Sequence, residues 1–125
     1  MIMGLERTVR FPSGTVPDWE RVVEKLNSMG DAPSLRMIDG QLAFPDEQPP
    51  VDWSELRIGL SAGMVTLRRQ SDRVLCLIWG NAEEELLRCR ERCAWAFATS
   101  GAGEVLDEQG TVIDLEQFHS QCRTD

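Results

Sequence analysis

Residues 64–97 read MVTLRRQSDRVLCLIWGNAEEELLRCRERCAWAF, and the rest of the chain has to be arranged around them. The sequence predicts a strand hairpin over residues 64–69 and 73–79, followed directly by a long amphipathic helix. Residues 74–79 are apolar at odd and even positions alike. Because successive side chains of a strand point to opposite faces, this strand would present apolar groups on both, which is typical of the interior of a sheet.

The start of the long helix is marked by Asn81, whose side-chain oxygen can accept hydrogen bonds from the first free backbone amides. Glu84 stands three residues later, as in a capping box. At about 100° per residue, one side of this helix is apolar and the other charged. The apolar stripe consists of Ala82, Leu86, Cys89, Cys93, Ala96 and Phe97, and the other side carries Glu84, Arg88, Glu91 and Arg92.

Upstream, apolar residues alternate with polar ones from Leu5 to Phe11, which predicts a strand that ends before Pro12. Thr15 is the expected cap of a helix that Gly30 closes. The inner stripe of this helix is Trp19, Val22, Val23, Leu26 and Met29.

Two segments, residues 35–38 and 41–44, flank Asp39-Gly40, a turn that suits a tight hairpin and would set Met37 opposite Leu42 and Leu35 opposite Phe44. The proline-rich segment 45–52 is expected to be an extended surface connector, and residues 53–60 alternate as a strand again.

After the long helix, the segment 101–103 breaks the pattern, and two short strands at 105–106 and 112–113 flank a turn. Asp114 is placed to cap a last helix with an inner stripe of Leu115, Phe118 and Cys122. The expected order is therefore β-α-β-β-β-β-β-α-β-β-α. Because hairpins join most of the strands, we predict a single α+β domain over residues 1–125, with an antiparallel sheet and helices on one face.

The chain of 125 residues carries 21 acidic and 13 basic side chains, a net charge of −8. This charge opposes binding to nucleic acid and to anionic membranes. Residues 1–5 lack a signal-peptide pattern, and no apolar run approaches the roughly 20 residues of a membrane span, so a cytoplasmic protein is expected. The one basic cluster, Arg68, Arg69 and Arg73, is interpreted as a solvated hairpin end.

A zinc site could be assembled on paper from Cys89, Cys93, His119 and Cys122, because each pair shares one face of a helix. The cysteines, however, lie in apolar stripes, where free cysteine is commonly buried as a small hydrophobe. We therefore predict core packing, with no metal and no cofactor. His119 is the only histidine, and no nucleophile stands beside it in a recognisable pattern, so we expect that the chain is not an enzyme.

Trp95 is expected on the charged side of the long helix, where it either packs beneath the C-terminal hairpin or faces a partner; Trp53 is a second candidate of the same kind. The leading hypothesis is thus a non-enzymatic protein–protein interaction domain, an adaptor or a homodimer. The rival hypothesis is a small apolar ligand held between the long helix and the sheet. Its pocket would be lined by Leu77, Trp79, Leu86 and Phe97.

Overall fold

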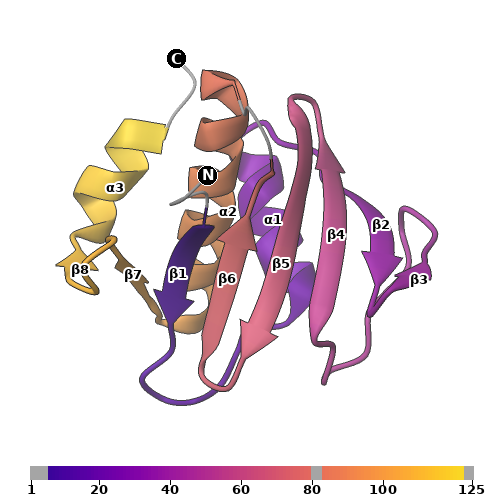
Figure 1. The fold of residues 1–125 in the computed structure, drawn as a ribbon, viewed down its shortest axis with the longest axis horizontal. Helices are drawn as coiled ribbons and strands as arrows, with labels where there is room; N and C mark the ends of the chain where they lie inside the picture. The colour runs from indigo at the N-terminus through magenta and orange to yellow at the C-terminus, as the bar shows by residue number, and fades with distance from the viewer. Residues whose placement is uncertain (1–5, 80–82, 123–125) are drawn as a thin grey trace.

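The strand at residues 73–77 lies in the interior of the sheet, as its apolar sequence predicts. In the computed structural model, which describes residues 6–79 and 83–122, β6 (Arg73–Leu77) pairs with β5 (Gly63–Gln70) on one side and with β1 (Glu6–Arg10) on the other. The eight strands of the described chain follow the order β3-β2-β4-β5-β6-β1-β7-β8 (Figure 1). Every neighbouring pair is antiparallel.

The remaining elements confirm the predicted order of strands and helices. They are α1 (Trp19–Ser28), β2 (Ser34–Ile38), β3 (Gln41–Leu42), β4 (Glu55–Leu60), α2 (Glu84–Gly101), β7 (Glu104–Leu106), β8 (Val112–Ile113) and α3 (Leu115–Cys122). Both edge strands, β3 and β8, contain only two residues. Short edges offer few unpaired backbone groups to another strand, so the sheet is protected against pairing along its edges.

The β2–β3 hairpin forms around Asp39-Gly40 as predicted, with both residues at positive φ (48° and 83°) and Met37 opposite Leu42. β3 ends at Leu42, and a register shift between Leu35 and Met37 interrupts the pairing of β2 with β4. The Asp39 carboxylate accepts hydrogen bonds from the backbone amides of Glu55 and Ser54, each at 2.8 Å, and these bonds lower the pKa of its carboxyl. The turn is thereby tied to the start of β4.

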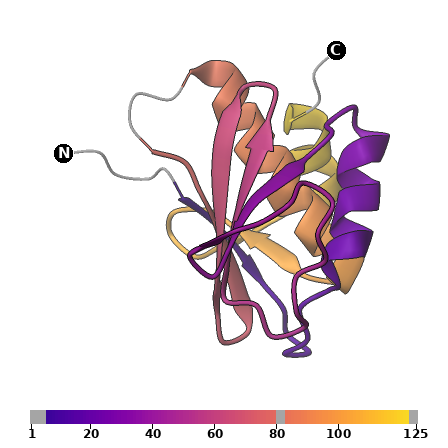
Figure 2. The ribbon, with the colours of Figure 1, turned by 90° about the vertical axis from the view of Figure 1, so that its right-hand side faces the viewer.

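All three described helices lie on one face of the sheet, which confirms the predicted α+β arrangement (Figure 2). α2 crosses behind β1, β5 and β6, and α1 and α3 pack against α2. No described helix or strand covers the opposite face of the sheet, which is turned toward the viewer in Figure 1.

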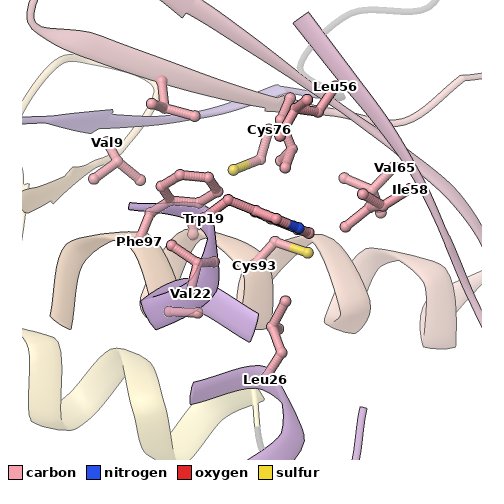
Figure 3. Packing of buried hydrophobic residues seen from close by; sticks show 14 of the residues in the cluster. Val9, Trp19, Val22, Leu26, Leu56, Ile58, Val65, Cys76, Cys93 and Phe97 are labelled. Carbon is pink, nitrogen blue, oxygen red and sulfur yellow. The ribbon is translucent and has the colours of Figure 1, made fainter. Parts of the chain in front are cut away.

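The main core fills the space between the sheet and the helices (Figure 3). Trp19 from α1 reaches between the layers, with Phe97 of α2 beside it at 6.3 Å between ring centroids. Cys76 from the sheet and Cys93 from α2 project into the same space. Both thiols are completely or almost completely buried, so they act as small apolar side chains in the core.

The starts of two helices differ from the sequence-based expectation. α1 begins at Trp19, with Asp18 rather than Thr15 at its N-cap position. Pro17 lies so close to the end of α2 that a Cβ added to Gly101 would stand 2.6 Å from its ring, and Asp18, which follows it, has an extended backbone. α2 begins at Glu84, and the expected cap Asn81, like Ala82 and Leu5, lies outside the described residues.

The charged side of α2 also differs from the expectation, because Arg92 is buried rather than solvated. Its guanidinium donates to the Asp31 carboxylate at 2.5 and 3.2 Å and to the backbone carbonyl of Cys122 at 3.0 Å. Glu91, on the same side, is bonded to Arg7 of β1. α2 packs on the sheet and is also flanked by α1 and α3, so none of its sides is wholly solvated. A single apolar stripe therefore does not predict which α2 residues are buried.

The C-terminal helix follows the prediction closely. The Asp114 side chain accepts a hydrogen bond from the backbone amide of Gln117 at 3.0 Å, as an N-cap residue does. Phe118 and Cys122 face inward and are buried, and Leu115 is partly buried against the core. The helix is thereby held against α2.

Candidate functional site

The face of the sheet opposite the helices, here called the open face, is identified by the strand register. Leu56, Leu67 and Cys76 lie side by side on β4, β5 and β6 and are buried in the core. Because side chains alternate along a strand, their neighbours along the chain point to the other face. Toward the β5–β6 turn, the open face carries the mostly polar residues Thr8, Arg10, Glu55, Arg68, Gln70, Arg73 and Leu75. Toward the other end it carries Glu6, Met37, Leu42, Arg57, Met64, Thr66 and Leu77.

Trp79 completes the open face just beyond the end of β6. Its indole Nε1 donates to the hydroxyl oxygen of Thr66 at 3.4 Å, so the ring lies over β5. Thr66 is only 1% exposed, whereas Trp79 itself is 60% exposed. Trp79 thus covers Thr66 and donates a hydrogen bond to its hydroxyl, while a large part of the Trp79 indole remains in contact with water.

The open-face residues form rows across the strands. One row runs from β3 to β1 and consists of Leu42, Met37, Arg57, Thr66, Leu77 and Glu6. A neighbouring row places Met64 opposite Gly59, and the β5–β6 register, continued two residues beyond β6, brings Trp79 opposite Met64. Leucine, methionine and tryptophan thus lie side by side on a sheet face that no helix or strand of the described chain covers.

Two arginines on the open face, Arg57 and Arg36, have no carboxylate partner among the residues that the structure describes. Arg57 makes no hydrogen bond or ion pair within the described chain, although its Nε atom is buried. Arg36 lies over Gly59 of β4, where a Cβ would come within 2.8 Å of its Nε. Arg68, by contrast, is paired with Glu55 at 3.0 Å. Tryptophan, methionine and arginine are among the residue types enriched where proteins bind one another.

The structure places the two predicted surface tryptophans elsewhere. Trp53 is 2% exposed, with its ring 6.2 Å from that of Phe97 and covered by the guanidinium of Arg69, so it is a core residue and not a contact surface. Trp95 is half-buried and stacks on His119 of α3, with 4.3 Å between ring centroids. Its surroundings are intramolecular, as in the packing alternative, although its partner is α3 rather than the C-terminal hairpin.

The four residues predicted to line a ligand pocket lie on two different faces of the sheet. Phe97 is fully buried in the core, and Leu86 of α2 packs over Gly63 on the helix side. Leu77 and Trp79 point to the open face. The pocket as predicted is therefore not formed. The prediction is wrong because residues 74–79 are apolar at every position, so the sequence does not indicate which face of the sheet each side chain occupies.

Two surface hollows lie away from these residues. The first, of about 140 Å³, is lined by Pro17 and Trp19 at the start of α1 and by the connector around Pro50. The second, of about 430 Å³, is an open depression between the Asp39 turn and Arg68. Drug-sized ligands occupy enclosed sites of roughly 300–1,000 Å³, and neither hollow combines that volume with enclosure.

The basic cluster at the β5–β6 turn is engaged within the chain. Arg68 pairs with Glu55, Arg69 donates to the backbone carbonyl of Val51 at 3.1 Å, and Arg73 lies 3.8 Å from Asp72. These partners support the interpretation of a solvated hairpin end.

The cysteines and His119 do not converge. Among the described residues, no three histidine, cysteine, aspartate or glutamate side chains are arranged to hold a metal ion. Burial raises the pKa of the Cys76 thiol to about 12 and that of Cys122 to about 11. Burial also raises the pKa values of Cys89 and Cys93, so all four thiols stay protonated and poorly nucleophilic near neutral pH.

The sequence predicts Trp79 only as a pocket residue and carries no local signal that marks Arg57, Met64 or Glu6 as surface-site residues. The alternation of residues 55–60 and 64–69 could have placed Arg57 and Thr66 on a polar face, but only the register sets them beside Leu77. Within the described chain, no helix has the length and apolar character needed to cross a membrane. The chain matches no protein-family model, and no curated protein or solved structure is significantly similar to it.

Proposed function

We propose that this chain is a protein–protein interaction module without catalytic activity, and that it works in the cytoplasm as a homodimer joined through the open face of its sheet. The observation that carries this proposal is Trp79, an indole 60% exposed on an uncovered sheet face beside Leu77 and Met64. Contiguous exposed apolar surface of this kind marks a place where another molecule binds.

The face of the sheet is favoured over its edges as the contact surface. β3 and β8 are too short to receive an added strand of useful length. The face, in contrast, extends across the longest strands, β4 and β5. Its mixture of aromatic, methionine and arginine side chains matches the centre of protein interfaces. A ligand-binding role is less favoured, because the residues expected to line its pocket lie on opposite faces of the sheet.

The test is sedimentation equilibrium of the purified chain at micromolar concentration. We expect the wild type to be a dimer and Trp79→Ala to weaken dimerisation at least tenfold, since removal of a central tryptophan commonly costs on the order of 2 kcal/mol of binding free energy. Val51→Ala is the matched control. Val51 is 84% exposed but lies in the connector beside α1, away from the open face.

Circular dichroism of the variants verifies that each is folded. A wild type that stays monomeric at all concentrations would refute the homodimer. So would a dimer that Trp79→Ala and Val51→Ala weaken equally, because the contact would then not involve the open face.

A further inference from the structure

The open face carries two opposite charges that have no ion-pair partner among residues 6–79 and 83–122. Arg57 on β4 and Glu6 on β1 occupy the same row, and neither forms an ion pair within the described chain. β5 and β6 lie between them. At about 4.8 Å per strand, three steps separate the two backbones by about 14 Å, which is too far for a salt bridge within one chain.

Their positions are symmetric about the boundary between β5 and β6. A two-fold axis that lies along this boundary, parallel to the strands and midway between two facing sheets, places β5 of one copy over β6 of the other. The same rotation places β4 over β1 and keeps each row at its own level. Arg57 of one copy then faces Glu6 of the second copy, and the reverse pair forms at the same time, as an isologous interface requires.

The apolar members of the two rows are also matched by this rotation. Thr66 on β5 faces Leu77 on the second copy's β6, and Met64 faces Trp79 of the second copy. A methionine sulfur against an indole ring is a favourable contact. Facing sheets pack about 10 Å apart, and their strands cross at about 30°. Facing residues are therefore best aligned near the two-fold axis and are shifted sideways from one another farther from it. The long Arg57 side chain can span this sideways shift.

From this symmetry we infer that two copies of the chain dimerise face to face about the β5–β6 boundary, with Arg57 of each copy paired to Glu6 of the other. The inference rests on the proposed function and adds the occupant of the open face, the position of the axis and the charge pair. The β4–β6 region forms the centre of the contact. The paired charges lie on either side of this apolar centre and fix the alignment of the copies.

The test is a charge exchange measured by sedimentation equilibrium. In the Arg57→Glu dimer, each of the two symmetric contacts sets the carboxylate of residue 57 against the Glu6 carboxylate. In the Glu6→Arg dimer, each contact sets two guanidinium groups against each other. We expect each single variant to weaken dimerisation at least tenfold. The double variant Arg57→Glu with Glu6→Arg restores the pair with reversed sign, and we expect its affinity to return to within about fivefold of the wild type.

A second measurement does not depend on the folding of the Arg57→Glu variant. In Arg57→Lys, a carbodiimide should couple the new amine to the carboxylate of Glu6 and give a covalent dimer, with the linked peptides identified by mass spectrometry. Lys25 is the only native lysine, so the wild type treated in the same way is the control.

The outcomes separate this inference from the proposed function. A wild-type dimer that Trp79→Ala disrupts, but that ignores the charge exchange and yields no link between residues 57 and 6, would refute the paired arrangement alone. A strictly monomeric wild type would refute both proposals. A monomer that instead binds a single-stranded oligonucleotide through Trp79 would also refute both, and would assign the open face to nucleic acid.

Discussion

Arg92 shows at the scale of one residue why a helical stripe is an incomplete guide to burial. Its spacing places it with Glu84, Arg88 and Glu91 on the charged side of α2, yet it is 2% exposed. Asp31, in the loop after α1, supplies the counter-charge. No local pattern in the sequence connects two residues that are 61 positions apart, so this ion pair could not be predicted.

We predict that Asp31→Ala destabilises the fold by about 3–5 kcal/mol, because it leaves the buried guanidinium of Arg92 without its principal carboxylate. Glu85, 3.5 Å from Arg92, offsets only part of this loss. Urea unfolding followed by tryptophan fluorescence measures the change. The exposed pair of Glu84 and Arg88 provides the control, since Glu84→Ala should cost less than about 0.5 kcal/mol. If the two substitutions lowered the free energy of unfolding equally, the buried ion pair of Arg92 and Asp31 would contribute no more to stability than the exposed pair.

At the scale of the element, the sequence predicts best where a structure depends on neighbouring residues. The Asp39-Gly40 turn and the Asp114 cap of α3 are both local, and both are confirmed. The start of α1 was wrong because it depends on a distant contact. Pro17 and Phe11 pack against the end of α2 at Gly101, and this tertiary contact fixes the position of the chain just before Asp18.

This contact leads to a prediction about two neighbouring residues at the end of α2. A Cβ at Gly101 would lie 2.6 Å from the Pro17 ring and 2.9 Å from Phe11, so Gly101→Ala should destabilise the protein by about 1–3 kcal/mol despite its better helix propensity. Ser100→Ala is the comparison. The Ser100 hydroxyl is buried and has no hydrogen-bond partner in the described part of the chain, so its removal should be neutral or slightly stabilising. Thermal unfolding of both variants measures the two effects. A stabilised Gly101→Ala variant would mean that Pro17 and Phe11 can move away from the added methyl group at little cost.

At the scale of the whole molecule, the fold class and the placement of all helices on one face were predictable from composition and hairpin spacing. The candidate site was not, because it depends on which face each strand residue occupies. Residues 74–79 are apolar throughout, so Leu77 and Trp79 were assigned to the helix side of the sheet. The register with Thr66 reverses that assignment and places both residues on the open face, where Trp79 is exposed and Leu77 is partly buried.

If the open face joins two copies, as proposed, the stability of the whole molecule depends on its concentration. If two chains fold and associate together, the unfolding midpoint must rise with protein concentration, and each tenfold increase adds about 1.4 kcal/mol of apparent stability per dimer. Each copy carries a net charge of −8, so the experiment is best done near 0.15 M salt, where the screening length is about 8 Å and repulsion between copies is reduced. We expect the thermal midpoint of the wild type to rise steadily over a hundredfold range of concentration. The midpoint of the Trp79→Ala chain should rise less over the same range, because its weakened dimer is less populated. A wild-type midpoint that stays constant would mean that the open face contributes nothing to the stability of the native state.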